Sequence, residues 1–393
     1  MSTYIIRAHF FNSDMRVSCT ILSMKKVLFV ATVVKKHIMQ FHIPYLKMLK
    51  EMGFETSVAA ANDYENPADC VIPWCDNYYN IPIERSPLNF RNIEAYRQLK
   101  TLIDENHYDL IHCHTPVGAF LARMAARDAR KTGTKVIYTA HGFHFFSGAP
   151  VQNWMIYYPV EKFASRFTDA LITINQEDYI RALKFHAKRV YYVPGVGIDM
   201  NRFSSRTSDK QSLRKQLNLD QDCFLLLSVG ELNQNKNHIS VIRALHEINY
   251  PNIQYVICGE GPDDIKLKEQ VHAFGLDNQV IFTGYTKQVK DYYQAADLFV
   301  FPSYREGLSL SLMEAISAHL PVLCSDIRGN RDLVQNADCR FQPGDQNELT
   351  EKLRKMLNQD NTSEAEKNYN NLSKYALNPV LEQVKKIYED CLR

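Results

Sequence analysis

The chain has 393 residues, of which 45% are hydrophobic and 23% are charged, a balance typical of a folded globular protein and not of a disordered or low-complexity chain. With 46 basic against 44 acidic residues, the net charge of +2 gives no general electrostatic field for nucleic acid. The length predicts two domains, and nine cysteines without a C-x-x-C pair favour a reducing compartment over a disulfide framework or a structural zinc site.

The N-terminal region carries a pattern that resembles a signal peptide. A pair of lysines precedes the apolar run Val27–Val34, but a second pair follows it at once, without a small-residue cleavage site. We therefore interpret Val27–Val34 as a buried first strand. Residues 1–23 show neither helical nor strand periodicity, and we expect them to form a disordered extension. No apolar run approaches the roughly 20 residues of a transmembrane helix, so we expect a cytoplasmic protein.

Short β-branched runs alternate with amphipathic stretches over residues 24–200. Strands are predicted at Val27–Val34, Thr56–Ala60, Leu110–Cys113, Lys135–Thr139, Ala170–Ile174 and Val190–Val193. Between them, helical spacing covers Ile38–Met52 and Val117–Lys131, and a glycine that can end a helix follows each. Such alternation predicts a parallel, doubly wound sheet, and thus a first Rossmann-like domain.

A second alternating series follows the turn at Pro194–Gly197. Its strands are predicted at Phe224–Val229, Gln254–Cys258, Val280–Phe282, Leu298–Phe301 and Pro321–Cys324. We place a second Rossmann-like domain at residues 201–376, and a C-terminal helix that packs toward the N-terminal domain at residues 377–393. The sequence thus predicts an α/β protein with two Rossmann-like domains facing across a cleft, where ligands bind at the carboxyl ends of the strands.

The strongest chemical signal is the segment Pro302–Glu314, in which a strand end and a glycine turn lead into a helix. Ser309 or Ser311 can cap that helix, whose free N–H groups and dipole suit phosphate oxygens. Glu306 and Glu314 would repel a phosphate, so we interpret them as acceptors for sugar hydroxyls. The alternative is a capped helix with solvated glutamates.

Two further strand ends carry weaker signals. In Ser228–His238 a lysine, Lys236, stands before a predicted helix, where it can hold a diphosphate as a point charge. The turn Gly259-Glu260-Gly261-Pro262 allows close approach of the backbone. Each pattern taken alone is also met in an ordinary surface lysine or a tight turn.

Histidines gather at strand ends of the first domain. His141 would lie at the carboxyl edge of the sheet, where a neutral imidazole can hydrogen-bond a sugar hydroxyl; a structural histidine is the alternative. His112 and His114 share one strand face, and with His141 or His144 a zinc site is conceivable. Because no carboxylate or cysteine stands at a convincing spacing, we expect no metal.

Basic residues also cluster in the first domain, on the two segments Arg123–Lys131 and Arg181–Arg189, and the aromatic run Trp154–Tyr158 lies between them. Solvated faces and core packing explain these features singly. Together they also suit a protein that rests on an anionic membrane.

These motifs together resemble those of the retaining glycosyltransferases of family 4, which have the GT-B fold. The residues that carry the resemblance are Glu306-x7-Glu314, Gly230 to Lys236, Gly259-Glu260-Gly261-Pro262, His141-Gly142 and Ser325–Asp332. The stretch Thr139–Asp199 is similar to the bacterial subgroup that builds capsular polysaccharide and exopolysaccharide. The resemblance implies transfer of a sugar, with retention, from a nucleotide-sugar such as a UDP-sugar to a saccharide or lipid-linked saccharide. It implies no cofactor and no metal, and work at the inner face of the cell membrane.

The resemblance also implies roles for single residues. Lys236, Leu308 and Ser309 would hold the donor diphosphate, Glu314 would accept the ribose hydroxyls, and His141, Glu306 and Lys236 would be catalytic. The other donor-binding residues would be Gly259, Glu260, Gly261, Pro262, Arg305 and Gly307. Expected on the acceptor side are Lys35, Lys36, His37, His114, Phe143 and His144.

The chain departs from the family pattern at two places. Glu231 stands where an arginine is frequent, so one diphosphate contact is missing or is supplied by another group such as Arg305 or Arg328. The loop Thr32–His37 lacks the usual glycine pair, and its basic side chains would take over those contacts. Two other functions stay open: a UDP-sugar epimerase of GT-B fold, and a non-catalytic nucleotide-sugar-binding subunit of a glycosyltransferase complex.

Overall fold

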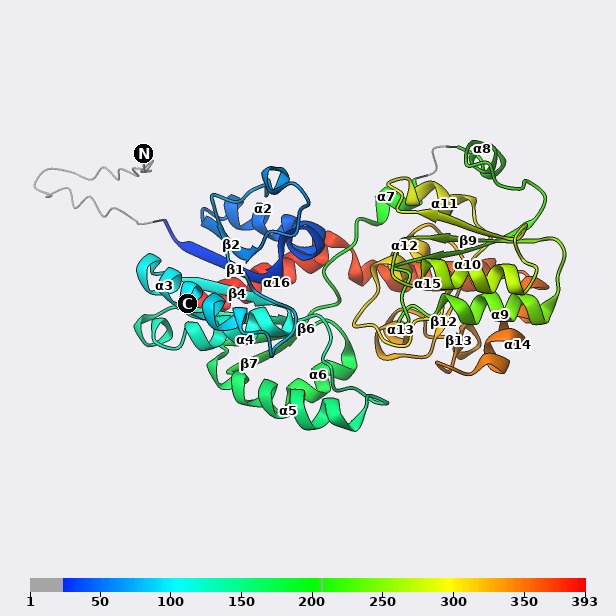
Figure 1. Cartoon of the computed structure of the whole chain (residues 1–393). Helices are drawn as coiled ribbons and strands as arrows, with labels where there is room; N and C mark the ends of the chain where they lie inside the picture. Colours follow the sequence, from blue (N-terminus) through cyan, green and yellow to red (C-terminus); the bar gives the residue numbers. More distant parts are fainter. Residues whose placement is uncertain (1–23, 206–207) are drawn as a thin grey trace, which may run out of the picture. The chain divides into compact units, whose positions relative to one another are not determined.

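The computed structural model describes residues 24–205 and 208–393, so the predicted extension 1–23 lies outside the described residues (Figure 1). The chain divides into two compact units, one ending at Val136 and the other running from Ile137 to Cys391. Among the described residues, no helix combines the length and the apolar composition that crossing a bilayer requires.

The strands are β1 (Lys26–Val33), β2 (Glu55–Ala61), β3 (Asn77–Asn80), β4 (Leu110–His114), β5 (Lys135–Ala140), β6 (Ala170–Thr173), β7 (Arg189–Tyr192), β8 (Phe224–Val229), β9 (Ile253–Cys258), β10 (Val280–Gly284), β11 (Leu298–Phe301), β12 (Val322–Ser325) and β13 (Arg340–Phe341). The α-helices are α1 (Met39–Phe41), α2 (Ile43–Glu51), α3 (Arg91–Asn106), α4 (Pro116–Ala125), α5 (Val151–Ala164), α6 (Gln176–Ala182), α7 (Met200–Ser204), α8 (Lys210–Gln216), α9 (His238–Ile248), α10 (Asp264–Ala273), α11 (Val289–Ala295), α12 (Leu310–Ser317), α13 (Arg328–Leu333), α14 (Gln346–Leu357), α15 (Thr362–Leu372) and α16 (Leu377–Leu392).

The first unit is built on parallel strands in the order β3-β2-β1-β4. Six of the eight residues of β1 are buried, as expected of a central parallel strand covered on both faces. After β1 the chain forms a short π-helix, η1 (Val34–Ile38), before α1 and α2. The stretch Ile38–Met52, for which helical spacing was predicted, is helical but divided, since α1 ends at Phe41 and α2 begins at Ile43. A break at His42 and a proline in the first turn of α2 restart the helix there.

The second unit contains β5-β6-β7 and a separate parallel sheet of order β10-β9-β8-β11-β12-β13. One hydrophobic core, extending from Ile198 to Tyr375, supports the separate sheet. All five strands predicted in this half of the chain are present, to within two residues at their ends. Two strands of the protein, β3 and β13, were not predicted. Both are sheet-edge strands: β3 is four polar or aromatic residues, and β13 has only two residues.

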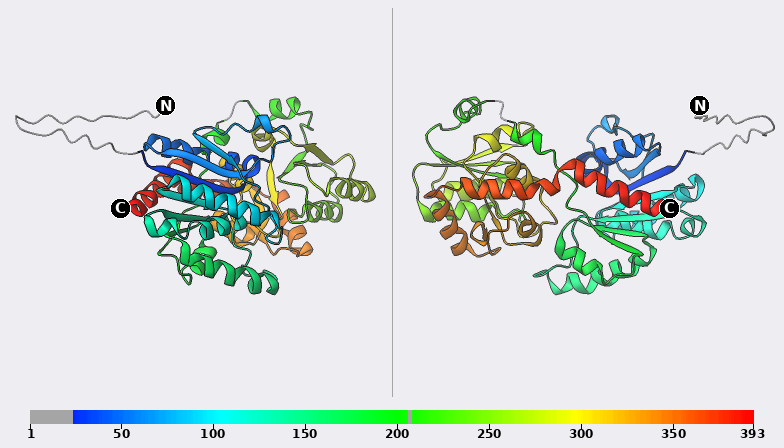
Figure 2. Two further views of the ribbon diagram at one scale, coloured as in Figure 1. Left: turned by 60° about the vertical axis from the view of Figure 1, so that its left-hand side comes forward. Right: turned by 180° about the vertical axis from the view of Figure 1, so that it is seen from behind.

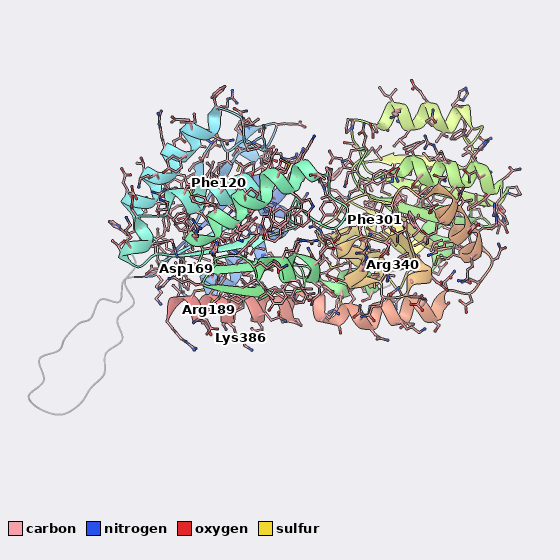
Figure 3. The ribbon with its side chains drawn as sticks, turned by 90° about the horizontal axis from the view of Figure 1, so that it is seen from below. Phe120, Asp169, Arg189, Phe301, Arg340 and Lys386 are labelled. Atoms are coloured by element: carbon pink, nitrogen blue, oxygen red, sulfur yellow. The ribbon has the colours of Figure 1, made fainter. Side chains whose placement is uncertain are left out.

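The C-terminal helix α16 runs back alongside β7, which belongs to the same unit. Ile198 and the segment before α16 are joined by two backbone hydrogen bonds, one of them from the Leu377 amide to the Ile198 carbonyl at 2.9 Å. At the far end of α16, the Asp390 carbonyl accepts from the Arg189 guanidinium of β7 at 3.4 Å. Figure 3 labels Arg189 of β7 and Lys386 of α16, and the right-hand view of Figure 2 shows α16 in red.

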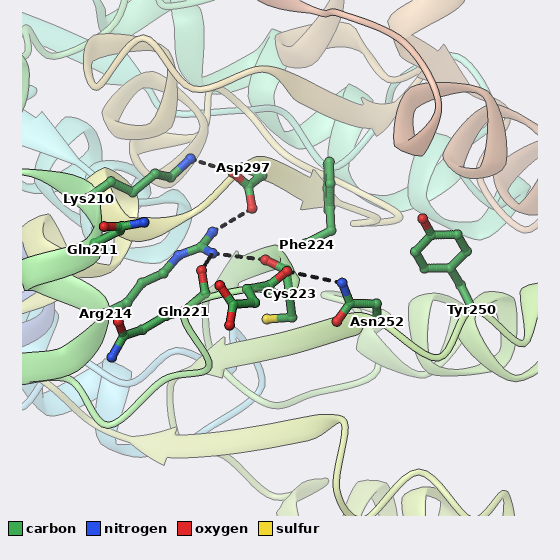
Figure 4. Close-up of a pocket in the computed structure, with 10 residues that line it drawn as sticks. Lys210, Gln211, Arg214, Gln221, Cys223, Phe224, Tyr250, Asn252 and Asp297 are labelled. Atoms are coloured by element: carbon green, nitrogen blue, oxygen red, sulfur yellow. Dashed lines mark hydrogen bonds and ion pairs between the residues drawn. The ribbon is translucent and has the colours of Figure 1, made fainter.

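A cavity of about 400 Å³ opens at the amino ends of β8 and β11, away from the strand ends where ligands were predicted (Figure 4). Its central side chain, Arg214, donates to the carbonyls of Ala295 and Cys223 and to the Asp297 carboxylate. Because these acceptors also belong to the sheet and its loops, we interpret Arg214 as a brace for this end of the sheet.

The loops after β8 and β9 pack backbone against backbone, and this contact needs glycine. A Cβ atom on Gly259 would lie 1.9 Å from the Gly230 carbonyl oxygen, and the φ angle of Gly259 is +152°. A Cβ on Gly261 would lie 2.3 Å from the Leu232 carbonyl oxygen. The two glycines therefore allow the loop that carries Lys236 to lie in direct main-chain contact with the loop after β9.

We expect Gly259→Ala to lower the free energy of unfolding by roughly 3 kcal/mol, because both the clash and the positive φ penalise a side chain. Gly275→Ala is the matched control: its φ is +66°, but no atom lies within 4 Å of the added Cβ. It should cost only about 1 kcal/mol. Thermal unfolding of the two variants measures the difference, and equal losses would show that the close approach is unimportant.

Candidate functional site

The N-terminus of α12 lies at the end of the β11 strand and its loop, where the sequence predicted it. Ser309 is the N-cap, and its Oγ accepts from the backbone N–H of Leu312 at 3.3 Å and lies 3.0 Å from Ser311 Oγ. Capping at Ser309 turns the positive end of the helix dipole toward the loop that contains Glu306 and Gly307.

Lys236 and Glu306 form an ion pair in front of this helix. Lys236 Nζ lies 2.7 Å from Glu306 Oε1, and the two side chains are only 18% and 15% exposed. The ammonium also lies 4.8 Å from the centre of the Phe301 ring. The carboxylate thus neutralises a largely buried cation. An incoming diphosphate can take its place as the partner of the lysine, which frees Glu306.

Hydrogen bonds join the Lys236 loop to the Glu306 loop. The Asn235 side-chain amide donates to the Arg305 carbonyl at 2.9 Å, and the Tyr304 backbone N–H donates to the Asn235 carbonyl at 2.8 Å. The backbone N–H of Lys236 donates to the Asn233 side chain at 3.0 Å. The position of the Lys236 ammonium is therefore set by the loop that carries its partner.

Arg328 binds protein groups with all three of its guanidinium nitrogens. Nε donates to the Glu306 carbonyl at 3.0 Å, Nη1 to Asp178 Oδ1 at 2.7 Å and Nη2 to the Phe143 carbonyl at 2.8 Å. The side chains of Arg328 and Asp178 are 3% and 0% exposed. Supply of the diphosphate contact by Arg328, one of the alternatives considered for the position of Glu231, does not fit this arrangement. Arg305, the other residue considered for that contact, is exposed.

Three glycines let three backbone segments meet around Arg328. A Cβ on Gly307 would lie 1.8 Å from the His141 carbonyl oxygen, and one on Gly329 would lie 2.3 Å from the Gly307 carbonyl oxygen. Gly142, with a φ of +139°, would place a Cβ 2.9 Å from Arg328 Nη2. The segment after β5, the loop before α12 and the start of α13 are therefore in direct main-chain contact.

His141 follows β5 and is half-buried. Burial lowers the pKa of its imidazole to about 4, so the ring is neutral at pH 7. The pKa of His144 is also lowered to about 4, by burial first and by the charges of Arg305 and Arg328 second. Its ring stacks on Tyr157 with centroids 4.6 Å apart.

Phe143, expected on the acceptor side, is a core residue in the structure. Its side chain is buried and stacks on Phe145 at 4.7 Å, and its backbone N–H donates to Asp178 Oδ2 at 3.0 Å. Its contribution is thus through its main chain, which accepts from Arg328 and donates to Asp178.

Glu314 is half-buried in α12 and accepts from the Tyr293 hydroxyl at 3.0 Å. Desolvation raises the pKa of Glu314 to about 7, against the opposing effect of the Tyr293 hydrogen bond. Sequence reasoning missed Tyr293, because it lies 21 residues upstream on α11 with no motif around it. Of the remaining donor-side residues, Glu260 and Pro262 are exposed, and Glu260 accepts from the backbone N–H of Tyr285 at 3.1 Å.

The other acceptor-side predictions fall in the first unit. Lys35 and Lys36 are exposed, and their backbone N–H groups both donate to the Asp63 carboxylate. His37 is buried, and its Nε2 lies 3.2 Å from Nε2 of His42, a residue that the sequence analysis did not single out.

The imidazole rings of several histidines in the first unit pack against one another. His42 stacks on His114 at 3.8 Å between centroids, and His112 lies 4.1 Å from His114. Nitrogen atoms of His37, His42 and His114 come within 4.8 Å of one another, which is close enough for a shared ion. Two imidazoles on one tetrahedral zinc would have centroids about 5 Å apart. The centroids of His42 and His114 are closer than this, whereas those of His37 and His42 lie 4.9 Å apart.

Comparison with known proteins identifies the class to which this fold and site belong. Residues 26–175 match the family model of glycosyl transferase 4-like domains, and residues 209–378 match that of the glycosyl transferases group 1. The crystal structure of HepE from Anabaena with UDP and glucose superposes with a TM-score of 0.75 at 18% identity, covering 93% of this chain and all of that one. The fold is thus that of the GT-B glycosyltransferases, with two Rossmann-like domains.

Two relatives are closer in sequence. A Bacillus subtilis protein named as the glycosyltransferase EpsD is 42% identical over 322 residues, which are 81% of this chain and 83% of EpsD. An Escherichia coli enzyme, named UDP-Gal:alpha-D-GlcNAc-diphosphoundecaprenol alpha-1,3-galactosyltransferase, is 31% identical over 265 residues, 64% of this chain and 67% of that one. The chain belongs to the family 4 glycosyltransferases.

The buried pair Arg328–Asp178 should behave as one unit in stability measurements. We expect Arg328→Ala or Asp178→Ala alone to cost about 3–5 kcal/mol, because each leaves a buried charge without its partner. The double variant should cost clearly less than the sum. Breaking the exposed pair Lys268–Asp264 by Lys268→Ala should cost well under 1 kcal/mol. Calorimetric unfolding compares them, and strict additivity of the two single losses would argue against coupling.

Glu314 should make stability depend on pH. Its folded pKa of about 7 lies above the ordinary value of 4.5, so the folded state binds the extra proton between these values. Stability should therefore fall as pH rises from about 4.5 to 7. Glu314→Gln should match the wild type at pH 5 and exceed it at pH 8 by about 2 kcal/mol, measured as a thermal midpoint. The exposed control Glu382→Gln should leave the pH profile unchanged, and a Glu314→Gln variant with the wild-type profile would contradict the assignment.

Proposed function

We propose that the enzyme transfers a sugar, with retention of anomeric configuration, from a UDP-sugar to a lipid-linked saccharide in the synthesis of a capsule or exopolysaccharide. The observation that carries the proposal is the Lys236–Glu306 pair in front of the α12 N-terminus. It combines a cation for a diphosphate with a carboxylate for a sugar hydroxyl in one place.

The chemistry follows from where charge develops. The bond between the anomeric carbon and the diphosphate oxygen breaks, and negative charge grows on the leaving diphosphate. The Lys236 ammonium and the first N–H groups of α12 stabilise that charge, so we propose that no metal ion is needed. Glu306, released from Lys236, accepts a hydroxyl of the donor sugar. The acceptor oxygen attacks on the face from which the diphosphate leaves, and a phosphate oxygen takes its proton.

His141 and Glu314 complete this proposal. A neutral imidazole at position 141 can both donate and accept a hydrogen bond, which suits a sugar hydroxyl better than an imidazolium does. The Glu314 carboxyl, already partnered by Tyr293, has a second oxygen with which to accept ribose hydroxyls.

The relatives support the choice of substrates. The Escherichia coli enzyme is named for a UDP-sugar and a sugar linked to diphosphoundecaprenol, and HepE was crystallised with UDP and glucose. Both names agree with a UDP-sugar donor, and the first agrees with a lipid diphosphate carrier for the acceptor. We also propose that the enzyme works at the inner face of the cell membrane, where such acceptors are held.

The test is UDP release from a panel of UDP-sugars, with and without lipid-linked saccharide acceptors. We expect release with one donor only in the presence of acceptor, undiminished by EDTA. Lys236→Ala and Glu306→Gln should each lower kcat/KM by about 10²–10³-fold, because each removes a group that stabilises the transition state. Lys266 is an exposed lysine on α10, and Lys266→Ala should leave kcat/KM unchanged.

Other results would replace the proposal. Conversion of a UDP-sugar to its epimer without acceptor would identify an epimerase. UDP binding without release, unaffected by Lys236→Ala in a complex with a partner enzyme, would identify a binding subunit.

A further inference from the structure

Helix α5 presents its apolar side chains to solvent, the reverse of an ordinary surface helix. Val151 and Met155 are each 72% exposed, and Ile156, Val160 and Phe163 are 58%, 43% and 45% exposed. The inner side of the helix is aromatic instead: Trp154 and Tyr158 pack on Phe145. We call the five exposed side chains the α5 surface.

Helix α6 lies beside α5 (Figure 1) and also exposes apolar side chains. The guanidinium of Arg181 on α6 lies 5.2 Å from the centre of the Trp154 ring on α5, which ties the two helices together. Ile180 on α6 and Leu183, the residue that follows this helix, are 60% and 56% exposed. A monomeric soluble protein seldom leaves so many large apolar side chains together in water, so this surface indicates an interaction.

The charges that are exposed around the α5 surface are positive. Lys162, Arg166 and Lys184 lie on or beside the two helices, Lys162 half-buried and the other two exposed. Lys162 and Arg166 flank the apolar stripe, with the Arg166 guanidinium 5.9 Å from the centre of the Phe163 ring.

Each acidic side chain between residues 151 and 188 is instead buried or paired. Glu161 is buried and accepts from the Tyr138 hydroxyl, Asp169 pairs with Lys188, and Glu177 pairs with Arg181. The fourth acid of the segment, Asp178, is fully buried against Arg328. The surface therefore offers apolar groups and positive charge, and little exposed negative charge.

We propose that the α5 surface docks the enzyme on an anionic lipid membrane, with its apolar side chains inserted at the level of the headgroups. Aliphatic side chains framed by lysine and arginine match the boundary between acyl chains and anionic headgroups. A second copy of the chain fits less well, because a symmetric contact would bring the basic residues of both copies together. The inference rests on the proposed lipid-linked acceptor for its purpose, since a carrier lipid is held in the membrane.

The experiment is flotation of the full chain with vesicles of phosphatidylcholine, alone or with about 30% phosphatidylglycerol. We expect binding to the anionic vesicles that is weakened, but not abolished, by salt. The double substitution Met155→Asp/Ile156→Asp should reduce binding about tenfold or more, and Lys162→Gln/Lys184→Gln should remove the preference for phosphatidylglycerol. Ile265→Asp is the matched control, because Ile265 is 72% exposed and lies on α10, away from α5 and α6 in the chain.

Unchanged flotation of Met155→Asp/Ile156→Asp would overturn the proposal, as would wild-type protein that ignores both kinds of vesicle. A wild-type dimer that this variant converts to a monomer, without vesicle binding, would instead make the surface a contact between copies. Thermal midpoints of the variants show that they fold. Transfer to a detergent-solubilised acceptor, measured in parallel, keeps the two proposals separate. For the wild type, transfer without flotation refutes only the membrane surface, and flotation without transfer refutes only the transferase reaction. For Met155→Asp/Ile156→Asp, we expect lost flotation with intact transfer.

Discussion

The site depends on one buried guanidinium. Arg328 bonds to the Asp178 carboxylate and to the carbonyls of Phe143 and Glu306, and so joins the segment after β5, helix α6 and the loop before α12. A buried arginine is tolerated only when its donors are satisfied and its charge is paired, and both conditions are met here. Arg328 thus fixes the main chain at Glu306, the residue whose side chain pairs with Lys236.

In the proposed reaction, the ion pair and the helix terminus would serve different stages. Without a ligand, Glu306 neutralises Lys236 and spares the protein an unpaired buried cation. A bound diphosphate would replace that carboxylate with a stronger anionic partner, and the charge that develops on it would meet groups already in place. Such preorganisation avoids the cost of rearranging solvent during the reaction. The close main-chain contacts at Gly307 and Gly259 also contribute to this preorganisation, because they pack the loops of the site directly against neighbouring backbone.

The parts of this structure that could be predicted from the sequence are those that depend on short-range residue patterns. Strands such as Phe224–Val229 and Leu298–Phe301 are continuous apolar runs, and Ser309 was a candidate cap because serine is favoured at the position just before an apolar helix. The clustering of Lys236, Glu306 and Gly307 followed from the rule that carboxyl ends of parallel strands share one edge. This rule predicts that the three residues lie near one another, but it does not predict the distances between their atoms.

What the sequence did not predict depends on contacts between distant residues. Tyr293 reaches Glu314 across two helices, and nothing in either local segment marks the pair. Arg328 was judged as a possible ligand for a diphosphate, because its partner Asp178 stands 150 residues upstream. Phe143 was counted among acceptor contacts although its ring is in the core, since one apolar letter does not tell which way it points. The inverted exposure of α5 is likewise invisible to periodicity, because its inner and outer faces are both apolar.

The contacts of Arg328 have a consequence for building chimaeric enzymes from members of this family. Exchange of the N-terminal half near residue 200 would take Gly142 and Asp178 from one parent and Gly307, Arg328 and Gly329 from the other. In such a hybrid, Asp178 would come from one parent and its partner Arg328 from the other. The main-chain contact between Gly142 and Gly307 would likewise combine segments of two parents. A crossover between Val136 and Ile137, where the compact units of this chain divide, keeps all five positions from one parent. The place at which these enzymes can be recombined is therefore set by main-chain contact and a buried charge, and not by the linker between the two sheets.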